Sequence, residues 1–246
     1  MAYKSLARVY DALTWDVPYV RMVEFAVSRF KRAAIPVKGV LDLACGTGSA
    51  SLRFAEIGYA VVSTDRSADM LSVARMKADE CENPPLFLLQ PMEKLDLYAR
   101  VDATCCFLDS LNYVRDEKTL SEIFRRVHLF LNPGGVFVFD VHAPGTLEER
   151  AGSAFADERD GVFCVWRASE TERKGEFSLL VDLFFEEGER YRRHTEEHFE
   201  YAHDPDMLQT LLTENGFTDI DITGAYTGHP ATDADSRLCF TASRPM

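Results

Sequence analysis

Residues 40–49 read VLDLACGTGS, an apolar segment that runs straight into a glycine-rich turn. The valine and leucine side chains predict a buried strand. Glycines at positions 46 and 48 remove the Cβ atoms that would keep a ligand away from the backbone. A helix is predicted directly afterwards, and its amino terminus favours a polar or anionic group. This strand-turn-helix unit predicts a nucleotide-like ligand bound to an α/β fold.

Strands and helices alternate outward from this unit. Strands are predicted at 39–44, 60–64, 86–89, 102–108 and 136–141, with helices at 50–57, 68–81 and 120–131 between them. Such alternation is typical of a parallel sheet with helices on both faces. Two helices, 3–13 and 19–30, are predicted before the first strand, and a helix at 205–215 precedes two closing strands, 220–223 and 238–242.

Residues 152–203 interrupt the alternation with three strand-like segments, 163–166, 177–185 and 191–201, joined by glycine-containing turns. We predict an antiparallel meander inserted into a single domain that spans 1–246, with residues 1–33 as a helical cover. In the last strand, alternation groups His194, His198 and Glu200 on one face. We expect that face to be solvated and expect no metal site there.

The composition excludes several classes of partner. The chain has 246 residues and a formal net charge of −13, from 40 acidic against 27 basic residues. Duplex DNA and anionic membranes require a positive surface, and RNA is disfavoured for the same reason. No signal peptide or bilayer-spanning apolar run is present, so we expect a cytoplasmic protein. Six cysteines without a C-x-x-C motif predict reduced thiols and no zinc site.

Two carboxylates narrow the chemical class of the predicted ligand. Asp42 ends the first strand, where it would repel a pyrophosphate but attract a cationic group. Asp65 ends the second strand and can accept both hydroxyls of a ribose. S-adenosylmethionine offers an amino group, a sulfonium and a ribose in the corresponding places. The alternatives are a helix-cap or turn role for Asp42 and a cap on the next helix for Asp65. A nicotinamide dehydrogenase is disfavoured by Asp42 and because the third glycine of G-x-G-x-x-G is missing.

Five sequence blocks resemble one known family. They are LARVYD (6–11), LDLACGTG (41–48), DRSADML (65–71), LDSLNY (108–113) and LNPGG (131–135). Together they are similar to the class I S-adenosylmethionine-dependent methyltransferases, and within them to small bacterial proteins with an N-terminal Tyr-Asp signature. The resemblance spans nearly the whole chain.

The resemblance implies a Rossmann-like seven-stranded sheet, mostly parallel, with order 3-2-1-4-5-7-6 and strand 7 antiparallel. It also implies that S-adenosylmethionine lies across the carboxyl ends of strands 1 and 2 and leaves as S-adenosylhomocysteine. The implied cofactor contacts are Asp42, Ala44, Gly46, Gly48, Asp65, Arg66, Met70, Gln90, Met92, Leu108 and Asn112. Gln90 and Met92 would flank the adenine, or Met92 would fill core space.

The acceptor is expected at the ends of strands 4 and 5. His142 is the first candidate base and Asp109 the second, with a strand-end or turn role as the alternative for each. Tyr10 would contact the methionine part or the acceptor, or pack in the core. DNA-methyltransferase motifs are absent, so an N or O nucleophile of a small molecule is expected. RNA methylation and a non-catalytic cofactor-binding role are the alternatives, and the insertion would roof the pocket or form a homodimer interface.

Overall fold

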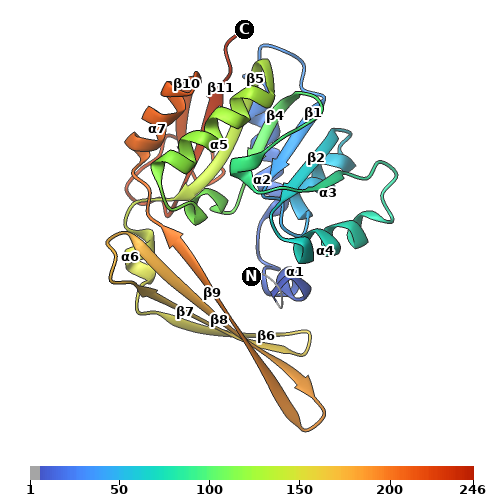
Figure 1. The fold of residues 1–246 in the computed structure, drawn as a ribbon, viewed down its shortest axis with the longest axis vertical. Helices are drawn as coiled ribbons and strands as arrows, with labels where there is room; N and C mark the ends of the chain where they lie inside the picture. Colours follow the sequence, from blue (N-terminus) through green and yellow to red (C-terminus); the bar gives the residue numbers. More distant parts are fainter. Residues whose placement is uncertain (1–5) are drawn as a thin grey trace.

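The structure is a computed structural model that describes residues 6–246. A seven-stranded sheet with its helices forms the upper part of the molecule in Figure 1, and a second, four-stranded sheet lies below it. The large sheet contains β1 (Gly39–Leu43), β2 (Ala60–Asp65), β3 (Leu86–Leu89), β4 (Val101–Cys106), β5 (Leu131–His142), β10 (Thr218–Gly224) and β11 (Arg237–Ser243).

The strand order of the large sheet is β3-β2-β1-β4-β5-β11-β10. Strands β1 to β5 are parallel, and β11 runs antiparallel to both of its neighbours. With β10 and β11 as strands 6 and 7, this is the predicted order 3-2-1-4-5-7-6. The Rossmann-like prediction is therefore confirmed.

Helices cover both faces of the large sheet, as expected for strands that are apolar on both sides. One core cluster joins α5 and α7 to the sheet and a second joins α2 and α3 to the opposite face. The helical segments are η1 (Leu6–Arg8), α1 (Tyr10–Leu13), α2 (Tyr19–Phe30), α3 (Ser49–Glu56), α4 (Ala68–Ala78), η2 (Met92–Lys94), η3 (Ser110–Tyr113), α5 (Glu117–Phe130), α6 (Thr146–Arg150) and α7 (Pro205–Glu214). No helix among residues 6–246 has the length and apolarity to cross a membrane.

The second sheet has the order β6-β7-β8-β9 and is antiparallel throughout. Its strands are β6 (Ala154–Arg159), β7 (Val162–Glu170), β8 (Glu176–Glu187) and β9 (Arg190–Tyr201). In Figure 1, α1 lies between this sheet and the large sheet. Leu6 and Leu13 pack there against apolar side chains of β7 and β8.

Several element boundaries differ from the sequence prediction. The predicted helix over 3–13 begins outside the described residues, and the described part is divided between η1 and α1. Both α6 and β6 were missed. β6 is mostly exposed and lacks an alternating apolar pattern, and α6 has only five residues, too few for a helical period to be visible. The six cysteines are free thiols, as predicted.

The LNPGG block brings β5 against β4 at the edge opposite the predicted cofactor end. A Cβ atom on Gly135 would lie 2.6 Å from the carbonyl oxygen of Asp102 and 2.9 Å from that of Asn132. Both obstacles are backbone atoms, which cannot move aside without disturbing the strands. The close approach of β5 to β4 therefore requires glycine at this position.

We expect Gly135→Ala to lower the free energy of unfolding by about 2–3 kcal/mol, because overpacking displaces the backbone. Gly228→Ala is the matched control, since a Cβ there meets no atom within 4 Å, and should change stability by less than about 0.5 kcal/mol. Chemical denaturation measures both. Equal stabilities of the two variants would contradict the assigned backbone contact.

Candidate functional site

A cavity of about 1180 Å³ lies between the large sheet, α1 and the inserted sheet. It opens where β1, β2, β4 and β5 end, as ligand sites in α/β sheets do. Of the residues singled out from the sequence, those lining it are Tyr10, Asp42, Ala44, Gly46, Asp65, Arg66, Met70, Gln90, Met92, Leu108, Asp109 and His142. Gly48 and Asn112 are not among its lining residues.

The two glycines of the turn have different structural roles. Gly46 has a φ of 54°, and a Cβ there would meet nothing within 4 Å, so its missing side chain leaves open space on the pocket side. Gly48 has a φ of 75°, and its Cβ would lie 3.0 Å from the Cβ of Ala74. Gly48 therefore allows close packing against α4, whereas Gly46 forms the pocket wall.

Asp65 holds the glycine turn while it faces the cavity. Its Oδ2 accepts a hydrogen bond of 2.9 Å from the backbone N–H of Gly46, and Oδ1 accepts one of 2.7 Å from Ser67. Burial raises the pKa of this carboxyl, and the two backbone donors oppose that rise. A carboxylate offers about four acceptor positions, so both the turn role and ribose binding are compatible with the geometry.

Asp42 is 2% exposed at the end of β1. Its Oδ2 accepts a hydrogen bond of 2.5 Å from Ser51 Oγ in α3. Burial raises the pKa of Asp42 to about 7, although the Ser51 hydrogen bond favours the ionised form. A cationic ligand group beside Asp42 would restore its charge, which suits the amino group of S-adenosylmethionine.

Asp11 was not among the predicted site residues, although it belongs to the LARVYD block (6–11). Asp11 Oδ1 accepts a hydrogen bond of 2.5 Å from Thr47 Oγ1 in the glycine turn, and Oδ2 forms a 2.7 Å ion pair with Lys77 Nζ of α4. Lys77 also donates to Ser49 Oγ at 2.7 Å. These contacts fasten α1, and with it Tyr10, over the glycine turn.

Gln90 and Met92, which are predicted to flank the adenine, both line the cavity. Both polar atoms of the Gln90 amide bond to the backbone of Asp96, at 2.9 and 3.0 Å. The Gln90 side chain is thus engaged within its own loop, although the residue lines the cavity. Met92 lines the cavity and also packs against the core cluster that contains Leu95, so core packing does not exclude a contact with the adenine.

Asp140 organises the acceptor end of the cavity. Leu108 and Asp109 both have positive φ, 54° and 52°, which strains residues other than glycine. The buried carboxylate of Asp140 accepts hydrogen bonds from both of their backbone N–H groups, at 2.9 and 2.7 Å. It also accepts from Tyr226 Oη at 2.6 Å and pairs with Arg237.

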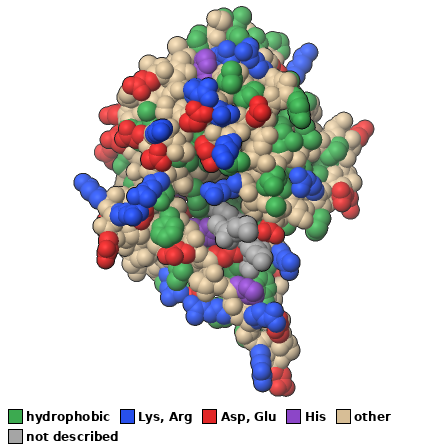
Figure 2. All heavy atoms as spheres, in the orientation of Figure 1, with side chains coloured by type: hydrophobic (Ala, Val, Ile, Leu, Met, Phe, Trp, Pro, Cys, Tyr) green, Lys and Arg blue, Asp and Glu red, His purple; other side chains and the backbone are tan. Residues whose placement is uncertain are grey.

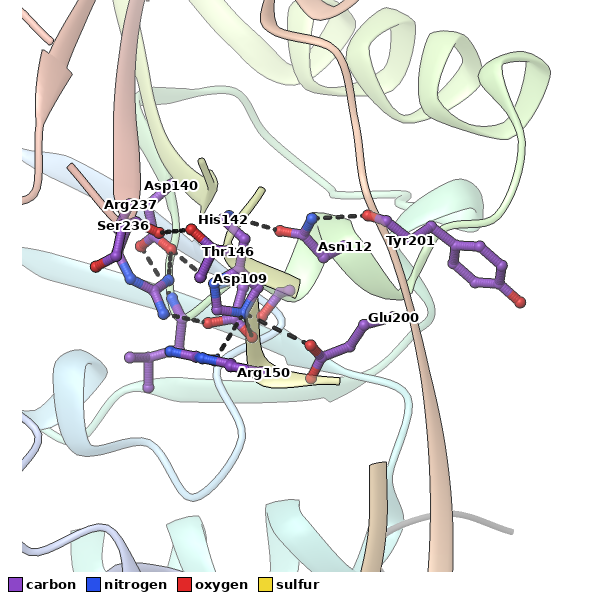
Figure 3. A network of polar contacts seen from close by, with 12 residues as sticks. Asp109, Asn112, Asp140, His142, Thr146, Arg150, Glu200, Tyr201, Ser236 and Arg237 are labelled. Atoms are coloured by element: carbon purple, nitrogen blue, oxygen red, sulfur yellow. Dashed lines mark hydrogen bonds and ion pairs between the residues drawn. The ribbon is translucent and has the colours of Figure 1, made fainter. Parts of the chain in front are cut away.

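His142 lies between two carboxylates. Its Nε2 is 3.5 Å from Asp109 Oδ2 and 3.6 Å from Glu200 Oε2, and Arg150 Nη1 approaches to 3.5 Å. Figure 3 shows Glu200 reaching toward this group from β9. Burial opposes ionisation of Asp109, but Arg237 and His142 outweigh it and hold the pKa of Asp109 well below its usual range. Burial and then Asp109 raise the pKa of Glu200.

Asn112 lies behind the pocket wall and positions its neighbours. Its Oδ1 accepts a hydrogen bond of 3.1 Å from the backbone N–H of His142, and its Nδ2 donates to the carbonyl of Tyr201 at 2.8 Å. The side chain is fully buried. Asn112 therefore ties the end of β5 to the end of β9, as Figure 3 shows.

The expectation that one face of the last insertion strand is solvated was wrong for its C-terminal half. His198 and Glu200 are 3% and 7% exposed, and both line the cavity. Glu196 Oε1, on the same face, accepts a hydrogen bond of 3.0 Å from the backbone N–H of Leu6. The alternation itself was right, but only the packing of β9 against η3 and the N-terminal segment decides which face is covered.

Basic side chains do not form a continuous stripe on the face drawn in Figure 2, where Lys and Arg are interspersed with Asp and Glu. Within the cavity lining, acidic residues outnumber basic ones. A polyanionic ligand would meet repulsion there. The distribution agrees with the charge argument made from composition.

Three known proteins are similar to the chain over almost its full length. YqeM of Bacillus subtilis, which carries the name of a methyltransferase, is 33% identical over 249 residues, covering 99% of this chain and 98% of that protein. A dTDP-3-amino-3,6-dideoxy-alpha-D-glucopyranose N,N-dimethyltransferase of Streptomyces fradiae is 26% identical, covering 95% and 94%. The crystal structure of an S-adenosylmethionine-dependent methyltransferase from Clostridium acetobutylicum superposes with a TM-score of 0.88, at 26% identity over the whole of both chains.

A family model described as a methyltransferase domain matches residues 40–135. That range runs from the start of the glycine-turn motif to the end of the LNPGG block. The full-length similarity extends the match to the insertion and both ends of the chain. The chain belongs to the class I S-adenosylmethionine-dependent methyltransferases.

Proposed function

We propose that the enzyme transfers the methyl group of S-adenosylmethionine to a nitrogen or oxygen nucleophile of a small molecule. The observation that carries this proposal is that one cavity joins the glycine turn to the Asp109–His142–Glu200 group. Pockets for a single ligand measure about 300–1,000 Å³. The larger volume of about 1180 Å³ supports simultaneous binding of cofactor and acceptor.

The cofactor end of the cavity supplies groups for each part of S-adenosylmethionine. Asp42 suits the amino group, Asp65 the ribose hydroxyls, and Met92 a face of the adenine. When bound, the cofactor provides a methyl group already activated on a sulfonium, so the chain's residues mainly align the acceptor and exclude water. The inserted sheet and α1 support the exclusion of water because both contribute walls of the cavity.

At the acceptor end, His142 is the proposed base. Its Nε2 has two carboxylates beside it, and this nitrogen is proposed to take the proton that the acceptor releases. Asp109 lies beside the same nitrogen and is itself held by Arg237. Tyr10 projects from α1 into the lining of the same cavity and is proposed to contact the methionine part or the acceptor.

A small-molecule acceptor is further supported by the Streptomyces fradiae relative, whose name gives an amino sugar as its substrate. The net charge of −13 argues in the same direction, because RNA binding requires a basic surface. We therefore place RNA methylation second. Tight, salt-sensitive association with RNA in a filter-binding assay would reverse that order.

We expect Asp65→Ala to bind S-adenosylhomocysteine about 10- to 100-fold more weakly than the wild type, because hydrogen bonds to a charged group contribute about 1.5–3 kcal/mol. Asp69→Ala, which removes an exposed carboxylate from the first turn of α4, should bind normally. Isothermal titration calorimetry with S-adenosylmethionine, S-adenosylhomocysteine and NAD measures the effect. Binding of NAD alone would contradict the assigned cofactor site.

We expect affinity for S-adenosylhomocysteine to rise as the pH increases toward about 7. Asp42 has a pKa raised to about 7, so it is neutral below that pH and gains the charge that attracts the ligand's amino group above it. One proton gives a slope of at most about tenfold per pH unit. Asp42→Asn should bind more weakly and flatten the profile; an unchanged slope would exclude Asp42 as the titrating group.

A further inference from the structure

The Glu200 carboxylate faces the cavity without a hydrogen-bond donor from the described residues. The residue is 7% exposed, yet it lines the cavity. Its ion-pair partner within residues 6–246 is His142, with Nε2 at 3.6 Å, and no described residue donates to it within hydrogen-bond distance. A carboxylate that is mostly removed from water and receives no hydrogen bond from the protein has lost part of its favourable hydration. A ligand group that donates hydrogen bonds would offset this loss.

A second carboxylate faces the same space. One ligand atom from each of Asp109, His142 and Glu200 lies within 4.8 Å of the others, and Figure 3 shows the three side chains converging. Asp109 is already paired with Arg237, whereas within residues 6–246 Glu200 forms no close ion pair with an arginine, and Arg150 and Arg237 act on it only at longer range. The unsatisfied negative charge in this part of the cavity is therefore centred on Glu200.

A divalent metal ion and an ammonium group are two kinds of cation that such a group of side chains can bind. Arg150 Nη1 lies 3.5 Å from the same His142 Nε2, and Arg237 contacts Asp109. These two guanidinium groups repel a doubly charged ion twice as strongly as a singly charged one. An ammonium group also donates hydrogen bonds, and an ionised carboxylate can only accept them. The surroundings therefore favour an ammonium group.

We propose that the methyl acceptor is a small amine, which binds as its ammonium cation to Glu200 of the inserted sheet beside Asp109 and His142. This inference rests on the proposed function and narrows its acceptor from N or O nucleophiles to amines. It also gives the insertion a direct part in acceptor recognition, since Glu200 belongs to β9. Proton removal by His142 Nε2 frees the nitrogen lone pair at the place where the amine is held.

The test compares probes of equal shape that differ in charge. The protein is saturated with S-adenosylhomocysteine and titrated in a calorimeter with cyclohexylamine and cyclohexanol, and then with glucosamine and glucose. We expect the wild type to bind at least one amine about tenfold or more tightly than its neutral partner, since charge-assisted hydrogen bonds are the stronger ones. Glu200→Gln should bring this ratio close to one. Glu186→Gln, which changes an exposed acid of the same sheet, should preserve it.

Failure of the amine site and failure of the proposed function give different results in this experiment. The amine site is overturned if the wild type binds neither amine more tightly than its neutral partner, which includes the case in which no probe binds. It is also overturned if Glu200→Gln keeps the preference for the amine. Binding of Mn²⁺ that displaces the amine and is lost in Glu200→Gln would assign a metal site instead. Failure of the wild type to bind S-adenosylhomocysteine would contradict the proposed function itself. Binding of S-adenosylhomocysteine by Glu200→Gln shows that this variant is folded.

Discussion

The acceptor end of the active site depends on the buried carboxylate of Asp140. Residues 108 and 109 both have left-handed backbone conformations, which cost of order 1–3 kcal/mol each in strain. Hydrogen bonds from both backbone N–H groups to Asp140 offset that cost, and Arg237 balances its charge. Because Arg237 also pairs with Asp109, one buried anion sets the geometry of the β4 end, the β5 end and β11 together.

The cavity is completed by two segments that are not part of the large sheet. α1 is fastened to the glycine turn through Asp11, Thr47 and Lys77, and the inserted sheet brings Glu200 to the end of β5. Asn112 connects that strand end to β9 by two hydrogen bonds. The glycine turn itself is a local motif, whereas its cover by α1 and the whole of the proposed acceptor end depend on contacts between distant segments.

Features built by local motifs were predictable from the sequence, whereas features built by contacts between distant segments were not. The strand order and the glycine turn were predictable because long apolar strands and a local motif carry their own signal. Strand β6 and helix α6 were not, because neither has a visible apolar period. Asn112 was assigned to the cofactor, but it lies behind the pocket wall, a position that depends on the packing of η3 against β9.

The sequence by itself determined the α/β fold, the family and the set of acids and glycines around the cofactor turn, since these residues lie within a few positions of each strand end. Only the tertiary structure decided that Glu200 is buried and faces His142, 58 positions away in the chain. Alternation along a strand defines two faces but not which one is covered. That choice is made by the elements that pack against the strand, and they are distant in sequence.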